Sequence, residues 1–104
     1  MDNKIDTYRY LVGAYYGIRE MDNYELKEYV LKDIEEYIDN YVKENYVNNF
    51  DYKEEARKVE KELSLKTKLQ DALIVLPKVN ASMELILLVK KRLKEIREEE
   101  LENM

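Results

Sequence analysis

The chain has 104 residues, ten of them tyrosine, and it contains no histidine, cysteine or tryptophan. Without cysteine there can be no disulfide or thiol chemistry, and without histidine the chain lacks the residue that most often transfers protons or binds metals. The net charge of -5 opposes general nucleic-acid binding, which depends on Lys and Arg contacts to phosphates. The composition therefore predicts no enzyme activity, no cofactor and no metal site, and favours a surface that binds another protein.

The length fits a single domain over residues 1–104, since one hydrophobic core typically serves about 100–150 residues. Two glycines and one proline supply few of the tight turns that a many-stranded sheet needs. The sequence begins without the basic patch and apolar run of a signal peptide, and its apolar runs are too short to cross a membrane. We expect a soluble, cytoplasmic, all-α protein that folds as a compact bundle of about four helices.

The first helix is predicted over residues 3–20, where Ile5, Tyr8 and Val12 recur at three- and four-residue steps and either Tyr15 or Tyr16 continues the pattern. Gly13 and Gly17 share one face of this helix, which allows another backbone to approach closely. Two glycines inside a helix cost about 1 kcal/mol each relative to alanine. Close packing or a partner contact should offset that cost.

The second helix is predicted over residues 23–47, and Asp22 and Glu25 have the spacing of a capping box at its start. One side is apolar and the opposite side is mainly acidic. The apolar side consists of Leu26, Val30, Ile34, Tyr37, Ile38 and Tyr41, and the opposite side of Glu25, Glu28, Lys32, Glu35, Glu36 and Asp39. Tyr29 and Tyr46 fall outside the apolar stripe, so we expect both to be exposed.

A third helix should begin after Asp51, because Asp51 and Glu54 again have capping-box spacing. The apolar pattern changes register near Ser64, which predicts that this helix is bent or split there. Pro77 disfavours helical geometry in the residue before it and therefore marks the helix end.

The last helix should begin after a cap at Asn80 or Ser82. Its predicted apolar stripe is Met83, Ile86, Val89, Leu93 and Ile96. An alternative is that residues 72–76 and 85–89 form a two-stranded hairpin, since short apolar runs cannot be assigned by periodicity alone. The Leu and Met content of the second run, and its helical continuation, favour the helix.

Paired carboxylates such as Glu35 and Asp39 could in principle bind a metal, but they lie opposite the apolar stripe and have no histidine beside them. We interpret the acidic side of the second helix as a surface for a protein partner, flanked by tyrosines, which are enriched at interfaces. The predicted contact residues are Glu28, Tyr29, Glu35, Glu36, Asp39 and Tyr46.

The run from Leu85 to Val89 is apolar around the whole helix, and a bundle of this size cannot cover one helix on every side. A second copy of the chain is the simplest cover, because most soluble oligomers are symmetric homo-oligomers. The sequence thus predicts a homodimer with Leu85, Leu87 and Leu88 at its interface.

The leading functional hypothesis is a small non-enzymatic protein-binding module that regulates or inhibits a larger macromolecule. The composition and size are similar to those of accessory proteins from phages or mobile elements. One alternative is a structural or assembly protein of the chaperone-like kind. Another is an acidic mimic of nucleic acid that blocks a DNA- or RNA-handling enzyme, since charge would steer it to a basic groove.

Overall fold

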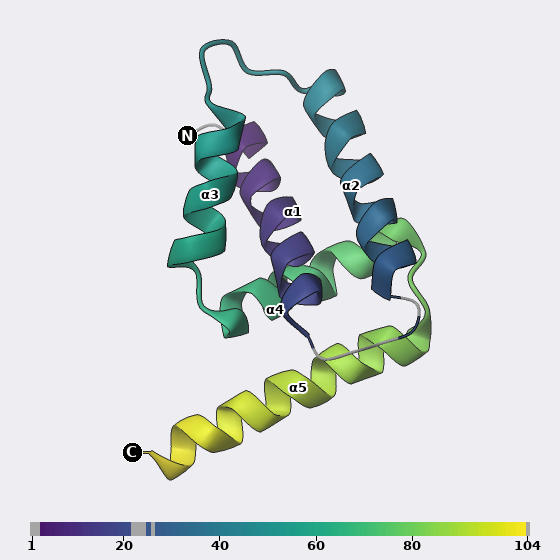
Figure 1. Cartoon of the computed structure of the whole chain (residues 1–104), viewed down its shortest axis with the longest axis vertical. Helices are drawn as coiled ribbons and strands as arrows, with labels where there is room; N and C mark the ends of the chain where they lie inside the picture. Colours follow the sequence, from purple (N-terminus) through teal and green to yellow (C-terminus); the bar gives the residue numbers. More distant parts are fainter. Residues whose placement is uncertain (1–2, 22–24, 26, 104) are drawn as a thin grey trace.

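The computed structural model of the chain describes residues 3–21, 25 and 27–103. These residues form five α-helices and one short 3₁₀ helix, without a strand among them (Figure 1). The elements are α1 (Asn3–Glu20), α2 (Lys27–Glu44), α3 (Tyr52–Glu62), α4 (Leu65–Val75), the 3₁₀ helix η1 (Leu76–Val79) and α5 (Met83–Glu102). The all-α prediction is confirmed, and the predicted count of four helices is too low by one.

The additional helix arises at Ser64, where the sequence predicted a bend or split. Leu63 leaves the helical region with a ψ of 139°, and Ser64 follows with a ψ of 157°. The Ser64 Oγ then accepts a hydrogen bond from the Thr67 backbone N–H at 3.2 Å, which caps a new helix. The chain therefore splits into α3 and α4, which run in different directions (Figure 1).

Polar side chains also fix the starts of α3 and α5. Asp51 Oδ1 accepts a hydrogen bond from the Glu54 backbone N–H at 3.1 Å, so the predicted cap is confirmed. Ser82, rather than Asn80, caps α5 through its Oγ, which accepts from the Leu85 backbone N–H. Asn80 instead adopts a left-handed φ of 55° and ends η1, a role that asparagine tolerates.

Residues 72–75 lie in α4 and residues 85–89 lie in α5, so the alternative hairpin is wrong. Helix α4 ends at Val75, close to the predicted end, and Pro77 is the second residue of η1. Leu76 nevertheless keeps helical geometry, with a φ of -53° and a ψ of -43°, so the expectation that Pro77 would move the preceding residue out of that geometry is wrong. The chain instead tightens from an α-helix into a 3₁₀ turn there. The capping box predicted from Asp22 and Glu25 includes Asp22, which lies outside the described residues.

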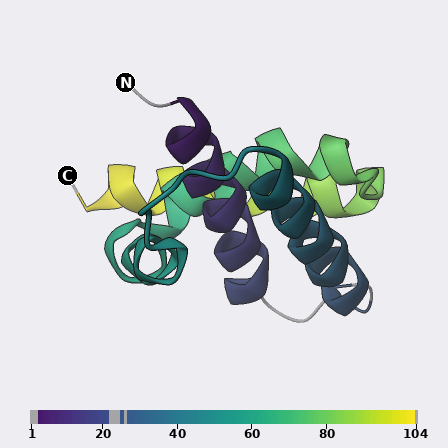
Figure 2. The same ribbon diagram turned by 90° about the horizontal axis from the view of Figure 1, so that it is seen from above.

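Helix α1 is the centre of the arrangement. It lies between α2 and α3 in both views, and both of these helices pack against it (Figures 1 and 2). Helix α4 crosses α1 on the far side, and α5 packs on α4 before extending away from the other helices (Figure 1). The residues on α1 consequently face three different neighbours.

Two hydrophobic clusters meet on α1. The larger contains Leu11, Ala14 and Ile18 of α1, which pack with buried side chains of α2, α4, η1 and α5. The smaller contains Tyr8 and Val12 of α1, which pack with Val59 of α3. The apolar pattern predicted for the first helix was therefore only one of its two buried faces.

The glycines of α1 allow α4 to approach closely. A Cβ atom on Gly17 would lie 2.8 Å from the Lys68 carbonyl oxygen and 2.9 Å from its carbon, so only glycine fits this backbone contact. A Cβ atom on Gly13 would collide with the Asp71 carboxylate. Both glycines serve helix packing within the chain.

Helix α5 buries most of the stripe that the sequence predicted, because Val89 and Leu93 are buried and Ile86 and Ile96 are partly buried against the main hydrophobic cluster. Leu85, Val89 and Leu93 are buried, and this spacing of four matches a helix that packs on one main neighbour, α4. Met83 was predicted to be on the buried side but is 66% exposed. It lies in the first turn, on the face of α5 that points away from Leu85.

We predict that Gly17→Ala lowers the free energy of unfolding by about 1–2 kcal/mol, measured by urea denaturation. The added methyl group must push apart two backbones, and this overpacking outweighs the gain of about 1 kcal/mol in helix propensity. Gly13→Ala should cost less, because only the side chain of Asp71 has to move. Equal effects of the two substitutions would contradict the proposed backbone contact at Gly17.

We also predict a pH-dependent effect at Asp71. Burial raises the pKa of this carboxyl to about 6 from an ordinary value of 3.8, so the folded chain holds the proton more tightly than the unfolded chain does. The resulting stabilisation is greatest at low pH and is lost as the pH rises from about 4 to about 6.

Asp71→Asn should therefore unfold with a free energy about 1–2 kcal/mol higher than the wild type at pH 7, after allowance for partial solvent screening. The difference should shrink toward zero as the pH falls to about 4. Urea denaturation of both proteins across this range measures it, and a difference that does not vary with pH would contradict the prediction.

Candidate functional site

An open groove of about 400 Å³ is lined by residues of α1, α2 and α3. Helix α1 forms its floor, α2 forms one wall and α3 the other. The lining residues are Tyr8, Val12, Tyr15, Tyr16 and Arg19 of α1, Glu35, Ile38 and Asp39 of α2, and Ala56 of α3. The lining thus combines aromatic rings, carboxylates and one cation.

The floor of the groove is aromatic. The rings of Tyr15 and Tyr16 meet edge to face, with centroids 5.4 Å apart and planes at 83°. The guanidinium carbon of Arg19 lies 5.9 Å from the centroid of the Tyr16 ring, and Arg19 Nη1 lies 3.8 Å from Glu60 Oε2. One end of the groove therefore already holds a guanidinium between a tyrosine ring and a carboxylate.

The α2 wall is acidic. The Tyr15 hydroxyl donates a hydrogen bond to Glu35 Oε1 at 2.8 Å, which links the wall to the floor. Asp39 lies one helical turn beyond Glu35 and is exposed. Within the described part of the chain, no ion pair or hydrogen bond engages the Asp39 carboxylate, so it is available to a ligand.

The hydroxyls of the floor are weaker acids than ordinary tyrosines. Burial, followed by the neighbouring Tyr16 and Tyr52, raises the pKa of Tyr8 to about 12, and the Tyr8 hydroxyl donates to the Tyr52 carbonyl at 3.0 Å. Burial and the hydrogen bond to Glu35 raise the pKa of Tyr15, and burial with the charge of Glu60 raises that of Tyr16. All three hydroxyls are protonated near neutral pH.

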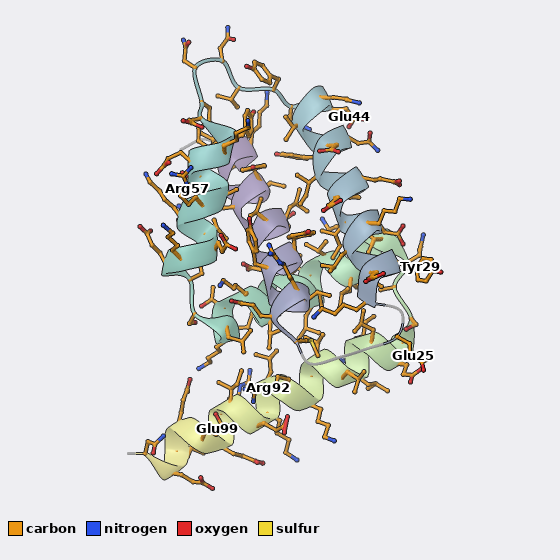
Figure 3. The ribbon with its side chains drawn as sticks, in the orientation of Figure 1. Glu25, Tyr29, Glu44, Arg57, Arg92 and Glu99 are labelled. Carbon is orange, nitrogen blue, oxygen red and sulfur yellow. The ribbon has the colours of Figure 1, made fainter. Side chains whose placement is uncertain are left out.

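The residues predicted to contact a partner divide among different parts of the surface. Glu35 and Asp39 line the groove, and Glu28 lies two turns earlier on the same flank of α2. Glu36 is exposed on the outer side of α2. Tyr29 is 69% exposed and projects from the start of α2 away from α1 (Figure 3).

Tyr46 follows the end of α2 and is 60% exposed, with its ring centroid 5.8 Å from that of Tyr52. The predicted exposure of Tyr29 and Tyr46 is confirmed. The two tyrosines lie at opposite ends of α2, so the predicted set is not one compact patch.

The predicted dimer residues also separate. Leu85 is 1% exposed and belongs to the main hydrophobic cluster of a single chain. Leu88 is partly buried, whereas Leu87 is 56% exposed. Leu87 is therefore the residue of the three that remains most accessible to a second molecule.

Sequence reasoning did not identify Tyr8, Tyr15 and Arg19 as parts of a site. Their spacing along α1 could have indicated a shared surface, because residues 8, 12, 15 and 19 lie on one helical face. That face was interpreted as part of the apolar core. Arg19 at the end of this face and the tyrosine hydroxyls along it are polar groups, which are typical of a partly exposed groove floor and not of a fully buried apolar stripe.

A second charged cluster surrounds Lys68, which is only 3% exposed. Its Nζ donates to the Glu60 carbonyl at 2.7 Å and to the two Glu20 carboxylate oxygens at 3.1 and 3.2 Å. These contacts satisfy the ammonium group and tie α4 to α1 and α3. The cluster is structural, since it leaves no donor for a ligand.

The described residues include no group of three or more acids close enough to hold a metal ion. None of the helices in the described ranges is long and apolar enough to cross a membrane. The groove is accordingly the candidate site.

Comparison of the chain with known protein families, with curated proteins and with solved structures finds no match. The function must therefore be inferred from the chemistry of the groove.

We predict that a spectrophotometric titration shows Tyr8 ionising only near pH 12, because burial raises its pKa to about 12. Tyr8→Phe should remove this transition. Tyr29→Phe, at an exposed position, serves as the matched control and should keep that transition. Its persistence in Tyr8→Phe would show that the hydroxyl is not buried as described.

Proposed function

We propose that this chain is a non-enzymatic protein-binding module that regulates or inhibits a larger partner, and that its groove receives a basic side chain of that partner. The main support for this proposal is the lining of the groove, where tyrosine rings lie beside the exposed carboxylates of Glu35 and Asp39. Aromatic faces and carboxylates both attract cations. An arginine or lysine side chain is the ligand that this lining fits best.

The chain contains an internal example of this chemistry. Arg19 already packs over the Tyr16 ring at one end of the groove and lies near Glu60. A partner arginine could make the equivalent contacts further along, over Tyr15 and against Asp39. Arginine suits such a site better than lysine does, because its planar guanidinium can stack on a ring and bind a carboxylate with two hydrogen bonds.

The shape of the groove favours a protein over a free small molecule. Its volume of about 400 Å³ is near the lower end of the roughly 300–1,000 Å³ found for small-molecule pockets, which bury most of their ligand. This groove is open, so a small molecule would remain largely in contact with water. A side chain that belongs to a larger partner would be covered from above by the rest of that partner.

The tyrosines support binding rather than catalysis. A phenol that acts as a base or nucleophile needs a lowered pKa, whereas the pKa values of Tyr8, Tyr15 and Tyr16 are raised. Protonated hydroxyls can still donate hydrogen bonds, as Tyr15 does to Glu35. The groove is thus equipped to recognise a ligand.

The other predicted contact residues extend this surface. Glu28 continues the acidic flank of α2, and Tyr46 lies beyond the end of the same helix. Glu36 and Tyr29 point elsewhere and would be reached only by a partner that wraps around α2. The cytoplasmic location stays a prediction from the start of the sequence and its short apolar runs, and the origin in a phage or mobile element stays a prediction from composition and size.

The test compares three immobilised proteins in affinity purification with mass spectrometry from the organism that encodes the chain. They are the wild type, a groove variant (Glu35→Lys with Asp39→Lys) and a control variant (Asp33→Lys with Glu44→Lys). Both variants change the charge of α2 equally, but the control residues are exposed on the opposite flank. Circular dichroism establishes that all three proteins are helical.

We expect the wild type and the control variant to retain a common partner with a basic surface, and the groove variant to retain at least about tenfold less of it. Raising the salt concentration should weaken the wild-type interaction. Equal retention by the groove variant would place the interface elsewhere and contradict the proposal.

A further inference from the structure

Helix α5 carries a continuous exposed stripe that no described element covers. Its members follow one another at steps of three or four residues, so they share one helical face, and all are exposed. The α5 stripe consists of Met83, Leu87, Lys90, Lys94, Arg97 and Leu101. It places three cations between apolar residues at the two ends.

The opposite side of α5 binds the rest of the chain. Leu85, Val89 and Leu93 are buried on that side, and the neighbouring Arg92 forms an ion pair with Glu99 at 3.6 Å (Figure 3). The stripe cations have no ion pair to any residue within the described ranges. Met83, Leu87 and Leu101 are each more than half exposed. Both the charged and the apolar side chains of the stripe are therefore accessible to a second molecule.

A complementary surface exists on α2 of the same chain. Its exposed residues include six acids and only two lysines. Helix α2 and the α5 stripe are each about 27 Å long, at 1.5 Å per residue. Among the described residues, no ion pair joins α2 to α5 within one chain, so both surfaces can accept a partner of opposite charge.

We propose that the α5 stripe of one copy docks on the acidic groove flank of α2 in a second copy. Lys90 and Lys94 are separated by four residues, as are Glu35 and Asp39, so two ion pairs can form together. The inference rests on the proposed function for the receiving surface and names a basic helix of the same chain as an occupant of the groove.

The apolar part of the stripe fits the same arrangement. When the two ion pairs form, Leu87 lies level with Val42 if the helices run antiparallel and close to Leu31 if they run parallel. Val42 and Leu31 are partly buried on the groove flank of α2. If the α5 stripe of each copy docks on α2 of the other copy, the two molecules form a two-fold symmetric dimer that contains this contact twice.

A nucleic acid or an anionic membrane fits the stripe less well. Glu98, Glu99, Glu100 and Glu102 follow the cations closely, and the whole chain has a net charge of -5. A long anionic polymer or surface would meet these acids as well as the lysines. Helix α2 of a second copy instead offers Glu35 and Asp39 at the same spacing as Lys90 and Lys94, so its carboxylates can be matched to these cations individually.

The decisive experiment uses charge reversal on each surface and sedimentation velocity at low salt. The stripe variant is Lys90→Glu with Lys94→Glu, and the groove variant is Glu35→Lys with Asp39→Lys. Each variant alone opposes like charges at both contacts of the dimer. An equimolar mixture restores opposite charges at both contacts. At one contact the acidic stripe of the first variant meets the basic groove of the second, and at the other contact the two unchanged surfaces meet.

We expect the wild type to form a dimer that dissociates as salt is raised, each variant alone to associate at least tenfold more weakly, and the mixture to recover a dimer. Lys58→Glu with Lys61→Glu, two exposed positions on α3, is the matched control and should dimerise as the wild type does. A wild type that stays monomeric at high concentration, a variant that still dimerises alone, or a mixture that stays monomeric would each overturn the inference.

The two proposals can fail separately. If the wild type is monomeric but the groove variant loses its partner in affinity purification, the groove binds a foreign protein and the self-association is wrong. If the mixed variants form a dimer but the groove variant retains every foreign partner, self-association stands and the proposed function fails.

Discussion

The structure depends on the close crossing of α1 and α4 at Gly17. There the backbones approach so closely that a methyl group on Gly17 would lie 2.8 Å from a carbonyl oxygen of α4. Helices α2 and α3 both pack on α1, and α5 packs on α4. The two sets of helices are therefore joined across this contact, and the buried Lys68, which binds Glu20 of α1 and the Glu60 carbonyl of α3, reinforces it.

The crossing also determines where the groove forms. Helices α2 and α3 lie on either side of α1 (Figure 2). Because α4 occupies the glycine face of α1, the tyrosine face lies between α2 and α3. Tyr8 and Val12 are covered there by α3, while Tyr15, Tyr16 and Arg19 remain partly or fully exposed. A chain with larger residues in place of the glycines would separate α1 from α4 and change the spacing of the groove walls. Packing and binding are thus linked through the same helix.

Local features of the sequence predicted much of this fold. The caps at Asp51 and Ser82, the register change at Ser64 and the stop at Pro77 all act over three or four residues, so they can be recognised without tertiary information. The groove could not be recognised in this way. Glu35 and Asp39 lie on the polar side of α2 in the sequence, and only the packing of α2 and α3 around α1 shows that they face the tyrosines. The burial of Leu85 in the main hydrophobic cluster is likewise a tertiary contact, and the apolar run from Leu85 to Val89 does not reveal it.

The close crossing can be measured directly in solution by nuclear Overhauser spectroscopy on isotope-labelled protein. The structure predicts strong cross-peaks between the Hα protons of Gly17 and the amide proton of Leu69, because the Leu69 nitrogen lies 3.2 Å from the position that a Cβ on Gly17 would occupy. Such cross-peaks would establish the contact on which the helix arrangement and the groove depend. Their absence, with Gly17 giving cross-peaks only to residues of its own helix, would contradict the account.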